Sequence, residues 1–189
     1  LKKFYMFFQF DTTFSIIPSA ITMHVVDSSK SNSLIIEVLK EFPQIAYPDP
    51  FKPALLRKPF KCIIDNQFSK ILEKHPKNDF ELNQDENFCT FAVELYNQSI
   101  VTKIVILNNF KAMMRRIVEN EYVQFEPLLI KLMQLANDET YKRDDKESSD
   151  AIKYLSTEII KMLKKTQLIS RKIALIEILK RIGINYLVE

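Results

Sequence analysis

The sequence predicts an all-α protein built as a stack of antiparallel helical hairpins. Apolar residues recur at helical spacing in five stretches joined by short polar breaks, at residues 60–74, 86–98, 102–118, 124–136 and 150–182. Only one glycine, Gly183, occurs among the 189 residues. Tight β-hairpin turns and phosphate-binding loops need glycine for positive φ, so its scarcity argues against β-meanders, dinucleotide-binding folds and P-loops.

The first third of the chain has a different composition. Residues 1–26 are apolar and aromatic, which indicates one or two short helices, with a strand as the alternative for the Phe-rich start. Ser33 is expected to cap a helix at 34–42 that Pro43 ends. Five prolines between Pro43 and Pro59 exclude a long helix there. This stretch is either a linker or, as we favour, an ordered hairpin loop. We therefore divide the chain into an N-terminal part, 1–59, packed on the same domain as helical repeats at 60–189.

Capping residues mark the expected helix boundaries. Asp85, the last residue of a polar loop at 77–85, is expected to cap the helix at 86–98, and Thr102 is expected to cap the next one. Residues 137–149 are expected to form a loop, with Ser148 or Ser149 capping a helix at 150–165 and Ser170 capping the last helix. The apolar stripes predict an inward-facing set that includes Phe60, Phe68, Phe88, Leu107, Phe110, Val118, Leu132, Leu135, Leu155, Ile159, Ile173, Ile176 and Leu179.

Positive charge is concentrated near the C-terminus. Between Lys153 and Arg181 there are eight bases and two acids, a charge of +6, whereas the whole chain carries +3. The simplest explanation is a solvated lysine-rich face. The functional alternative is contact with phosphates or with an acidic protein surface.

The residues that common enzymes need are not arranged for catalysis. The two histidines, His24 and His75, lie on dissimilar segments, and no serine or cysteine stands in a recognisable nucleophile motif. Cys62 and Cys89 lie beside core positions, form no metal-ligand spacing and fit a reducing compartment. We therefore expect a protein that is not an enzyme and that has no cofactor and no metal.

The chain shows no membrane or targeting signal that would place it elsewhere than the cytoplasm, with the nucleus as the alternative. No stretch approaches 18 uninterrupted apolar residues, so no membrane span is expected. The start, LKKFYMFFQF, is interrupted by Asp11 and does not read as a signal peptide. Because the first residue is Leu, we expect the chain to be a fragment of a longer protein.

Four segments together resemble the middle domain of the eukaryotic translation initiation factor 4G family. They are FKCIIDNQFSKILEK (60–74), FCTFAVELYNQSIVTKIVI (88–106), FEPLLIKLMQLANDE (125–139) and LISRKIALIEILKRIGINYL (168–187). The second is the best match, with Glu94-Leu95-Tyr96 at the family's Glu-Leu-aromatic triplet. Residues 1–59 lack the family's first helix pairs, and Val93 replaces a small residue, so a divergent member is indicated.

The resemblance implies a HEAT-like α-solenoid that acts as a non-enzymatic interaction scaffold in translation or mRNA regulation. Its partner would be a helicase, another translation or mRNA-decay factor, or RNA. The alternative is a helical repeat scaffold of an unrelated complex, such as a coat or nuclear assembly subunit. The candidate binding residues are the basic ones on the last helices, with a second patch on helix 102–118: Lys161, Lys164, Lys165, Arg171, Lys172, Lys111, Arg115 and Arg116.

Overall fold

A computed structural model describes residues 53–73, 79–119 and 123–186, together with residues 20, 21, 23 and 35–37. Within these residues all regular structure is helical and no strand occurs, which confirms the all-α prediction. Residues 35–37 are helical, in agreement with the helix expected at 34–42, whereas the Phe-rich start lies outside the described part. The chain forms two compact units, Leu1–Thr102 and Lys103–Glu189.

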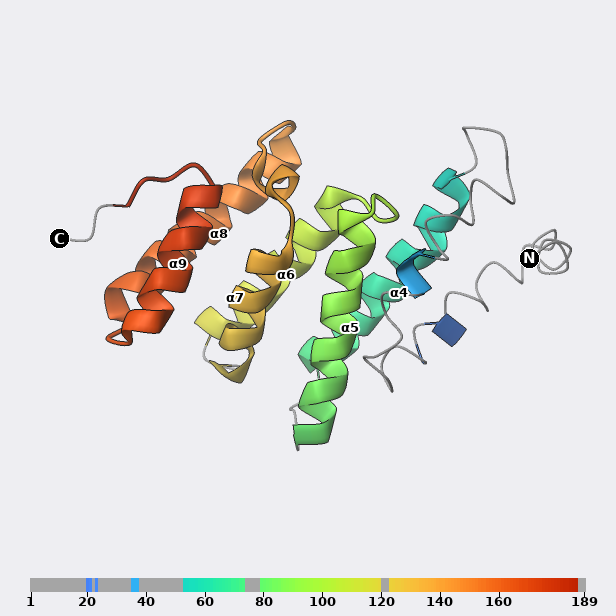
Figure 1. The fold of residues 1–189 in the computed structure, drawn as a ribbon, viewed down its shortest axis with the longest axis horizontal. Helices are drawn as coiled ribbons and strands as arrows, with labels where there is room; N and C mark the ends of the chain where they lie inside the picture. Colours follow the sequence, from blue (N-terminus) through green and yellow to red (C-terminus); the bar gives the residue numbers. More distant parts are fainter. Residues whose placement is uncertain are drawn as a thin grey trace, which may run out of the picture. The chain divides into compact units, whose positions relative to one another are not determined.

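The first unit contains a pair of helices, α4 (Pro53–Glu73) and α5 (Asp79–Asn97) (Figure 1). Phe68 of α4 and Phe88 of α5 meet edge to face, with ring centroids 5.7 Å apart. Such aromatic pairs add stabilisation beyond the area they bury. The inward stripes predicted for both helices are confirmed, since Phe60, Ile64, Phe68, Phe88, Phe91 and Leu95 are buried.

Both helices of this pair begin earlier than the sequence predicts. Helix α4 starts at Pro53 and continues through Pro59, where we expected a loop. An interior proline removes one backbone hydrogen bond, but the buried face that begins at Phe60 supplies packing that offsets this cost. Helix α5 starts at Asp79, so residues 79–85 are helical and Asp85 is not its cap. The first two turns of α5 contain only two large apolar residues, Phe80 and Leu82, and neither of them is buried, so these turns carry no inward-facing stripe that the sequence could reveal.

The second unit contains two helical hairpins. The first is α6 (Lys103–Val118) and α7 (Glu126–Leu135), joined through a short 3₁₀ turn, η3 (Val123–Phe125). The second is α8 (Lys146–Lys165) and α9 (Ile169–Arg181), preceded by η4 (Asp138–Tyr141). Helix α6 packs against α8, and α7 packs against α9 (Figure 1).

Polar contacts show that equivalent helices of the two hairpins run in the same direction. Near the start of α6, Lys103 pairs with Asp144 at 2.6 Å, and the Asn108 amide donates to Glu147 at 3.1 Å. At the end of α7, Gln134 donates to Glu177 of α9 at 2.9 Å. These partners are 41, 39 and 43 residues apart in sequence. The second hairpin therefore repeats the first with a nearly constant offset.

The ends of α8 and α9 differ from the expected caps. Asp145 is the N-cap of α8: its carboxylate accepts from the Ser148 backbone N–H at 2.8 Å. Neither Ser148 nor Ser149 caps the helix, and residues 146–149 are helical. The N-cap of α9 is Leu168, not Ser170, and it makes no side-chain cap. Gly183, with φ of 85°, ends α9 through a bond from Ile184 N–H to Leu179 O at 2.8 Å.

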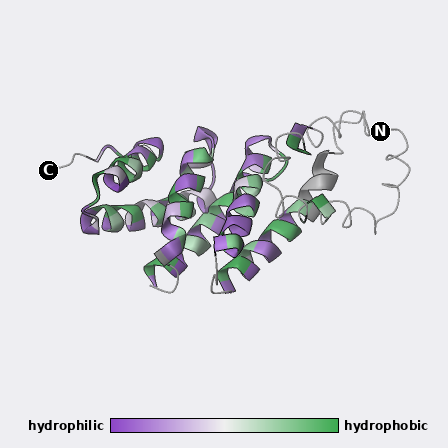
Figure 2. Cartoon of the chain, turned by 60° about the horizontal axis from the view of Figure 1, so that its bottom comes forward, coloured by the Kyte–Doolittle hydropathy of each residue, from purple (hydrophilic) through white to green (hydrophobic). Residues whose placement is uncertain are grey.

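Each helix of the two units carries a hydrophobic and a hydrophilic side (Figure 2). The core of the second unit includes Leu107, Phe110, Leu132, Leu155 and Ile159, as the periodicity predicted. Three residues of the predicted inward set are exposed instead: Val118, Leu135 and Ile173. The first two are the last residues of α6 and α7. Ile173 is the largest departure, since 62% of it is accessible.

Candidate functional site

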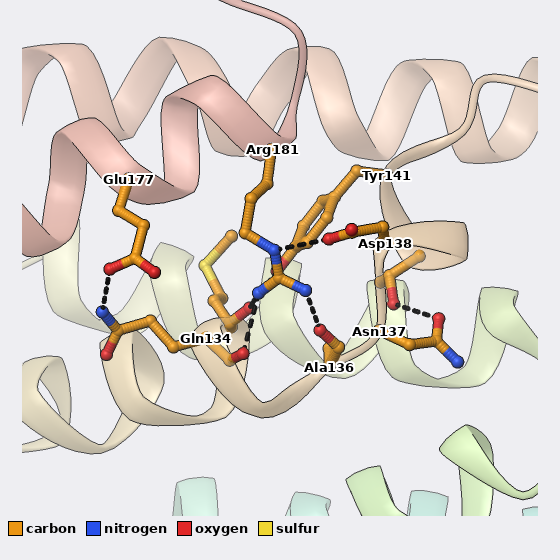
Figure 3. A network of polar contacts seen from close by, with 9 residues as sticks. Gln134, Ala136, Asn137, Asp138, Tyr141, Glu177 and Arg181 are labelled. Carbon is orange, nitrogen blue, oxygen red and sulfur yellow. Dashed lines mark hydrogen bonds and ion pairs between the residues drawn. The ribbon is translucent and has the colours of Figure 1, made fainter.

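Arg181 belongs to the basic segment, but its side chain contacts other residues of the second unit (Figure 3). Its guanidinium donates to the carbonyls of Met133 at 2.9 Å and Gln134 at 2.7 Å, and also to that of Ala136. These are carbonyls at the end of α7 that have no partner within the helix. The guanidinium also pairs with Asp138 at 2.7 Å and lies 5.1 Å from the Tyr141 ring centroid. Arg181 thus caps α7 from α9 and is not part of a solvated cationic face.

Arg171, a predicted binding residue, is paired within the chain as well. Its guanidinium contacts the carboxylate of Glu126, which is buried at the start of α7. The contact is an ion pair without good hydrogen-bond alignment, because Glu126 Oε1 and Arg171 Nε have no hydrogen-bond partner. A cation at a helix N-terminus is disfavoured by the helix dipole. The Glu126 carboxylate explains its presence here, so that placement is no sign of an external partner.

Lys161 is also engaged with its own helix. Its ammonium lies 2.7 Å from Glu158, whose side chain is largely buried. Pairs of this kind, three residues apart on a helix, add a few tenths of a kcal/mol. Lys161 therefore compensates a buried carboxylate, although its own side chain is exposed.

Two residues of the predicted second patch, Lys111 and Arg115, lie beside Tyr154 of α8. Lys111 sits over the Tyr154 ring, 5.8 Å from its centroid. Burial raises the pKa of the Tyr154 hydroxyl, as does Glu158, while a hydrogen bond with Arg115 partly offsets the rise. Arg116 is engaged with another group of the chain. The three cations thus do not form an unoccupied surface.

Three predicted residues remain available: Lys164, Lys165 and Lys172. Lys164 and Lys165 end α8 and are exposed, and Lys172 is half-buried near the start of α9. Within residues 53–73, 79–119 and 123–186 none of them makes an ion pair or a side-chain hydrogen bond. Lys153 and Lys180 are likewise exposed, on the middle of α8 and the end of α9.

Beside these lysines lies an apolar group that the sequence did not reveal. Leu168, Ile169 and Ile173 are 64%, 75% and 62% exposed. Helix α9 carries apolar residues on two faces, and only the face with Leu175, Ile178 and Leu179 is buried. The spacing of Ile169, Ile173 and Ile176 could have identified the second face, but periodicity alone does not say which face is inward.

The described residues contain no cluster of three or more His, Cys, Asp or Glu side chains that could hold a metal ion. Burial raises the pKa of the Cys89 thiol well above its ordinary value, so the reactive thiolate is disfavoured. His24 and His75 lie outside the part of the chain that the structure describes. None of the helices described is long and apolar enough to cross a bilayer.

Comparison with known proteins gives no assignment. No protein-family model, curated protein or solved structure matches the chain significantly. A functional proposal therefore depends on the geometry of the second unit and on the four resembling segments.

Proposed function

We propose that this chain is a non-enzymatic helical repeat scaffold of the HEAT-like type, whose helix pairs hold a protein factor or RNA in translation or mRNA regulation. The supporting observation is the offset between equivalent hairpins. Side-chain contacts from α6 to the α8 hairpin and from α7 to α9 join residues 39 to 48 apart. HEAT and armadillo repeats have periods of roughly 40–47 residues.

The parallel course of equivalent helices supports the same proposal. In a solenoid each repeat contacts its neighbours, and the repeated edge forms an extended surface that is rigid before binding. A rigid surface loses little conformational entropy when a partner docks. A scaffold can therefore bind tightly without the convergent polar groups of an enzyme pocket.

The pattern of engaged cations favours a protein partner over RNA. Arg171, Arg181 and Lys161 are paired within the chain, so fewer charges remain for phosphate contacts than the sequence suggests. RNA recognition also commonly uses aromatic stacking, and the apolar residues beside the remaining lysines are leucine and isoleucine.

A pull-down from cell extract with and without nuclease tests this proposal. We expect the full chain to retain a helicase or a translation or mRNA-decay factor after nuclease treatment. Loss of all retained protein on nuclease treatment would instead indicate direct RNA binding, whose affinity falls steeply with salt. Retention of coat or nuclear-assembly subunits would support an unrelated helical scaffold. Retention of nothing in either condition would refute the scaffold proposal.

A further inference from the structure

Six residues at the turn between α8 and α9 combine exposed apolar groups with cations. We call them the α8–α9 corner; they are Lys164, Lys165, Leu168, Ile169, Lys172 and Ile173. All lie within ten consecutive residues, so the turn between the helices keeps them close together. Among the described residues of the second unit, the three apolar members are the most exposed large hydrophobic side chains. Contiguous exposed apolar groups rimmed by polar ones mark sites of protein association.

Two of the three apolar members lie on one face of α9. Ile169 and Ile173 are four residues apart and so lie one above the other on the helix surface. Leu168 precedes them at the N-cap position. The opposite side of the helix is fixed in the core, because Leu175, Ile178 and Leu179 are fully buried. The exposed face therefore cannot turn inward, and none of the described residues of this unit covers it.

The charge of the corner is not neutralised within the described chain. Lys164, Lys165 and Lys172 make no ion pair there, in contrast with Lys161, Arg171 and Arg181. The first turn of α9 contains no acidic residue, and its N-cap makes no side-chain hydrogen bond. The corner thus carries three uncompensated positive charges around an apolar centre, and an acidic apolar surface is its complement.

We propose that the α8–α9 corner binds an acidic amphipathic peptide segment of a protein partner. Leucine, isoleucine or phenylalanine side chains of that segment cover Leu168, Ile169 and Ile173. Its Asp and Glu carboxylates pair with Lys164, Lys165 and Lys172. This inference rests on the proposed scaffold function and names the site and the chemistry of its partner.

Two other anionic partners fit the corner less well. The phosphates of a nucleic acid would pair with the lysines. Its bases would find no aromatic side chain to stack on, because the three apolar side chains of the corner are aliphatic. A membrane surface would need a longer apolar face than this, because a helix that lies on a bilayer buries an apolar face along its whole length. Here Leu175, Ile178 and Leu179 of α9 are in the core, so the exposed apolar face is short.

The test begins with an unbiased ligand. A library of random 16-residue peptides is selected on the full chain, and enriched peptides are measured by fluorescence anisotropy at low and high salt. We expect enriched sequences that combine several Asp or Glu residues with Leu, Ile or Phe. Enrichment of basic or uncharged sequences, or no enrichment, would overturn the proposal.

Matched variants then locate the site. Two variants of the corner are made: the double variant Ile169→Ser/Ile173→Ser and the triple variant Lys164→Gln/Lys165→Gln/Lys172→Gln. Each is expected to weaken binding of the selected peptide by roughly ten-fold or more, as for central interface residues. The control Lys153→Gln/Lys180→Gln removes exposed cations elsewhere on the same helices and should leave binding unchanged. Equal losses in the control, or none in the corner variants, would overturn the assignment. Urea unfolding of every variant confirms that each one is folded.

Competition distinguishes the remaining partners. Vesicles of phosphatidylserine and phosphatidylcholine, and poly(U) RNA, are added to the peptide complex. If either binds the corner more tightly than the peptide and depends on Ile169 and Ile173, the peptide proposal is wrong. If a factor is retained in the pull-down but the corner variants retain it equally, the corner fails while the scaffold proposal stands.

Discussion

Arg181→Ala is the change that most directly tests how the second unit is held together. The Arg181 side chain is only 20% exposed, and its guanidinium donates to three carbonyls at the end of α7 and covers the Tyr141 ring. A hydrogen bond to a charged group contributes about 1.5–3 kcal/mol. Two of the three carbonyls are partly buried, and water can replace some of the lost bonds. We therefore expect a loss of about 3 kcal/mol in the free energy of unfolding.

Urea unfolding followed by circular dichroism measures this loss. For a chain of this size, about 3 kcal/mol corresponds to a fall in Tm of roughly 6–12 °C. Asp138→Ala is the matched control, because it removes the exposed carboxylate that Arg181 pairs with but leaves the carbonyl bonds. An exposed ion pair contributes less than about 1 kcal/mol. The reasoning is refuted if Asp138→Ala costs as much as Arg181→Ala, or if Arg181→Ala costs less than about 1 kcal/mol.

Three further changes test single features. Burial raises the pKa of Glu94, so ionisation of this carboxyl opposes folding as pH rises above 4.5. Glu94→Gln should therefore raise the free energy of unfolding at pH 7, and this gain should disappear below pH 4.5. Hydrogen bonds from Ser148 lower the pKa of Asp145; Asp145→Ala should destabilise the chain at pH 7, and the difference should shrink as pH falls below 3.8. Ser99, just after α5, has a φ of 61°, a conformation that glycine adopts without steric cost. Ser99→Gly should therefore raise the free energy of unfolding by about 0.5–1 kcal/mol. Chemical denaturation across pH checks all three. A pH-independent Glu94→Gln effect, a constant Asp145→Ala difference or a destabilising Ser99→Gly would each contradict its rationale.

The helices were predictable because burial of one face leaves a period in the sequence. The stripes that contain Phe68, Phe110 and Leu155 were identified correctly, and all three residues are buried. First turns that bury no apolar stripe leave no such period, which is why the starts of α5 and α8 were missed. The continuation of α4 through Pro59 was missed because the local preference of proline predicts a break there. Packing from Phe60 onward outweighs that local cost.

The candidate site was less predictable, because the partners of a cation are set by tertiary contacts. Arg171 and Lys172 are neighbours in the sequence, yet only Arg171 meets a carboxylate, that of Glu126 on another helix. The acceptors of Arg181 are backbone carbonyls, which leave no signature in the sequence. A count of charges therefore overstated the cationic surface, and the exposed face of α9 was assigned to the core.

Urea unfolding of two double variants with equal charge change tests the division between structural and available cations most directly. Arg171→Gln/Arg181→Gln removes two cations that hold α9 on α7, and it should lower the free energy of unfolding by more than about 3 kcal/mol. Lys165→Gln/Lys172→Gln removes two cations at helix ends whose dipole effects oppose each other, and it should change stability by less than about 0.5 kcal/mol. Similar losses in the two variants would contradict the account.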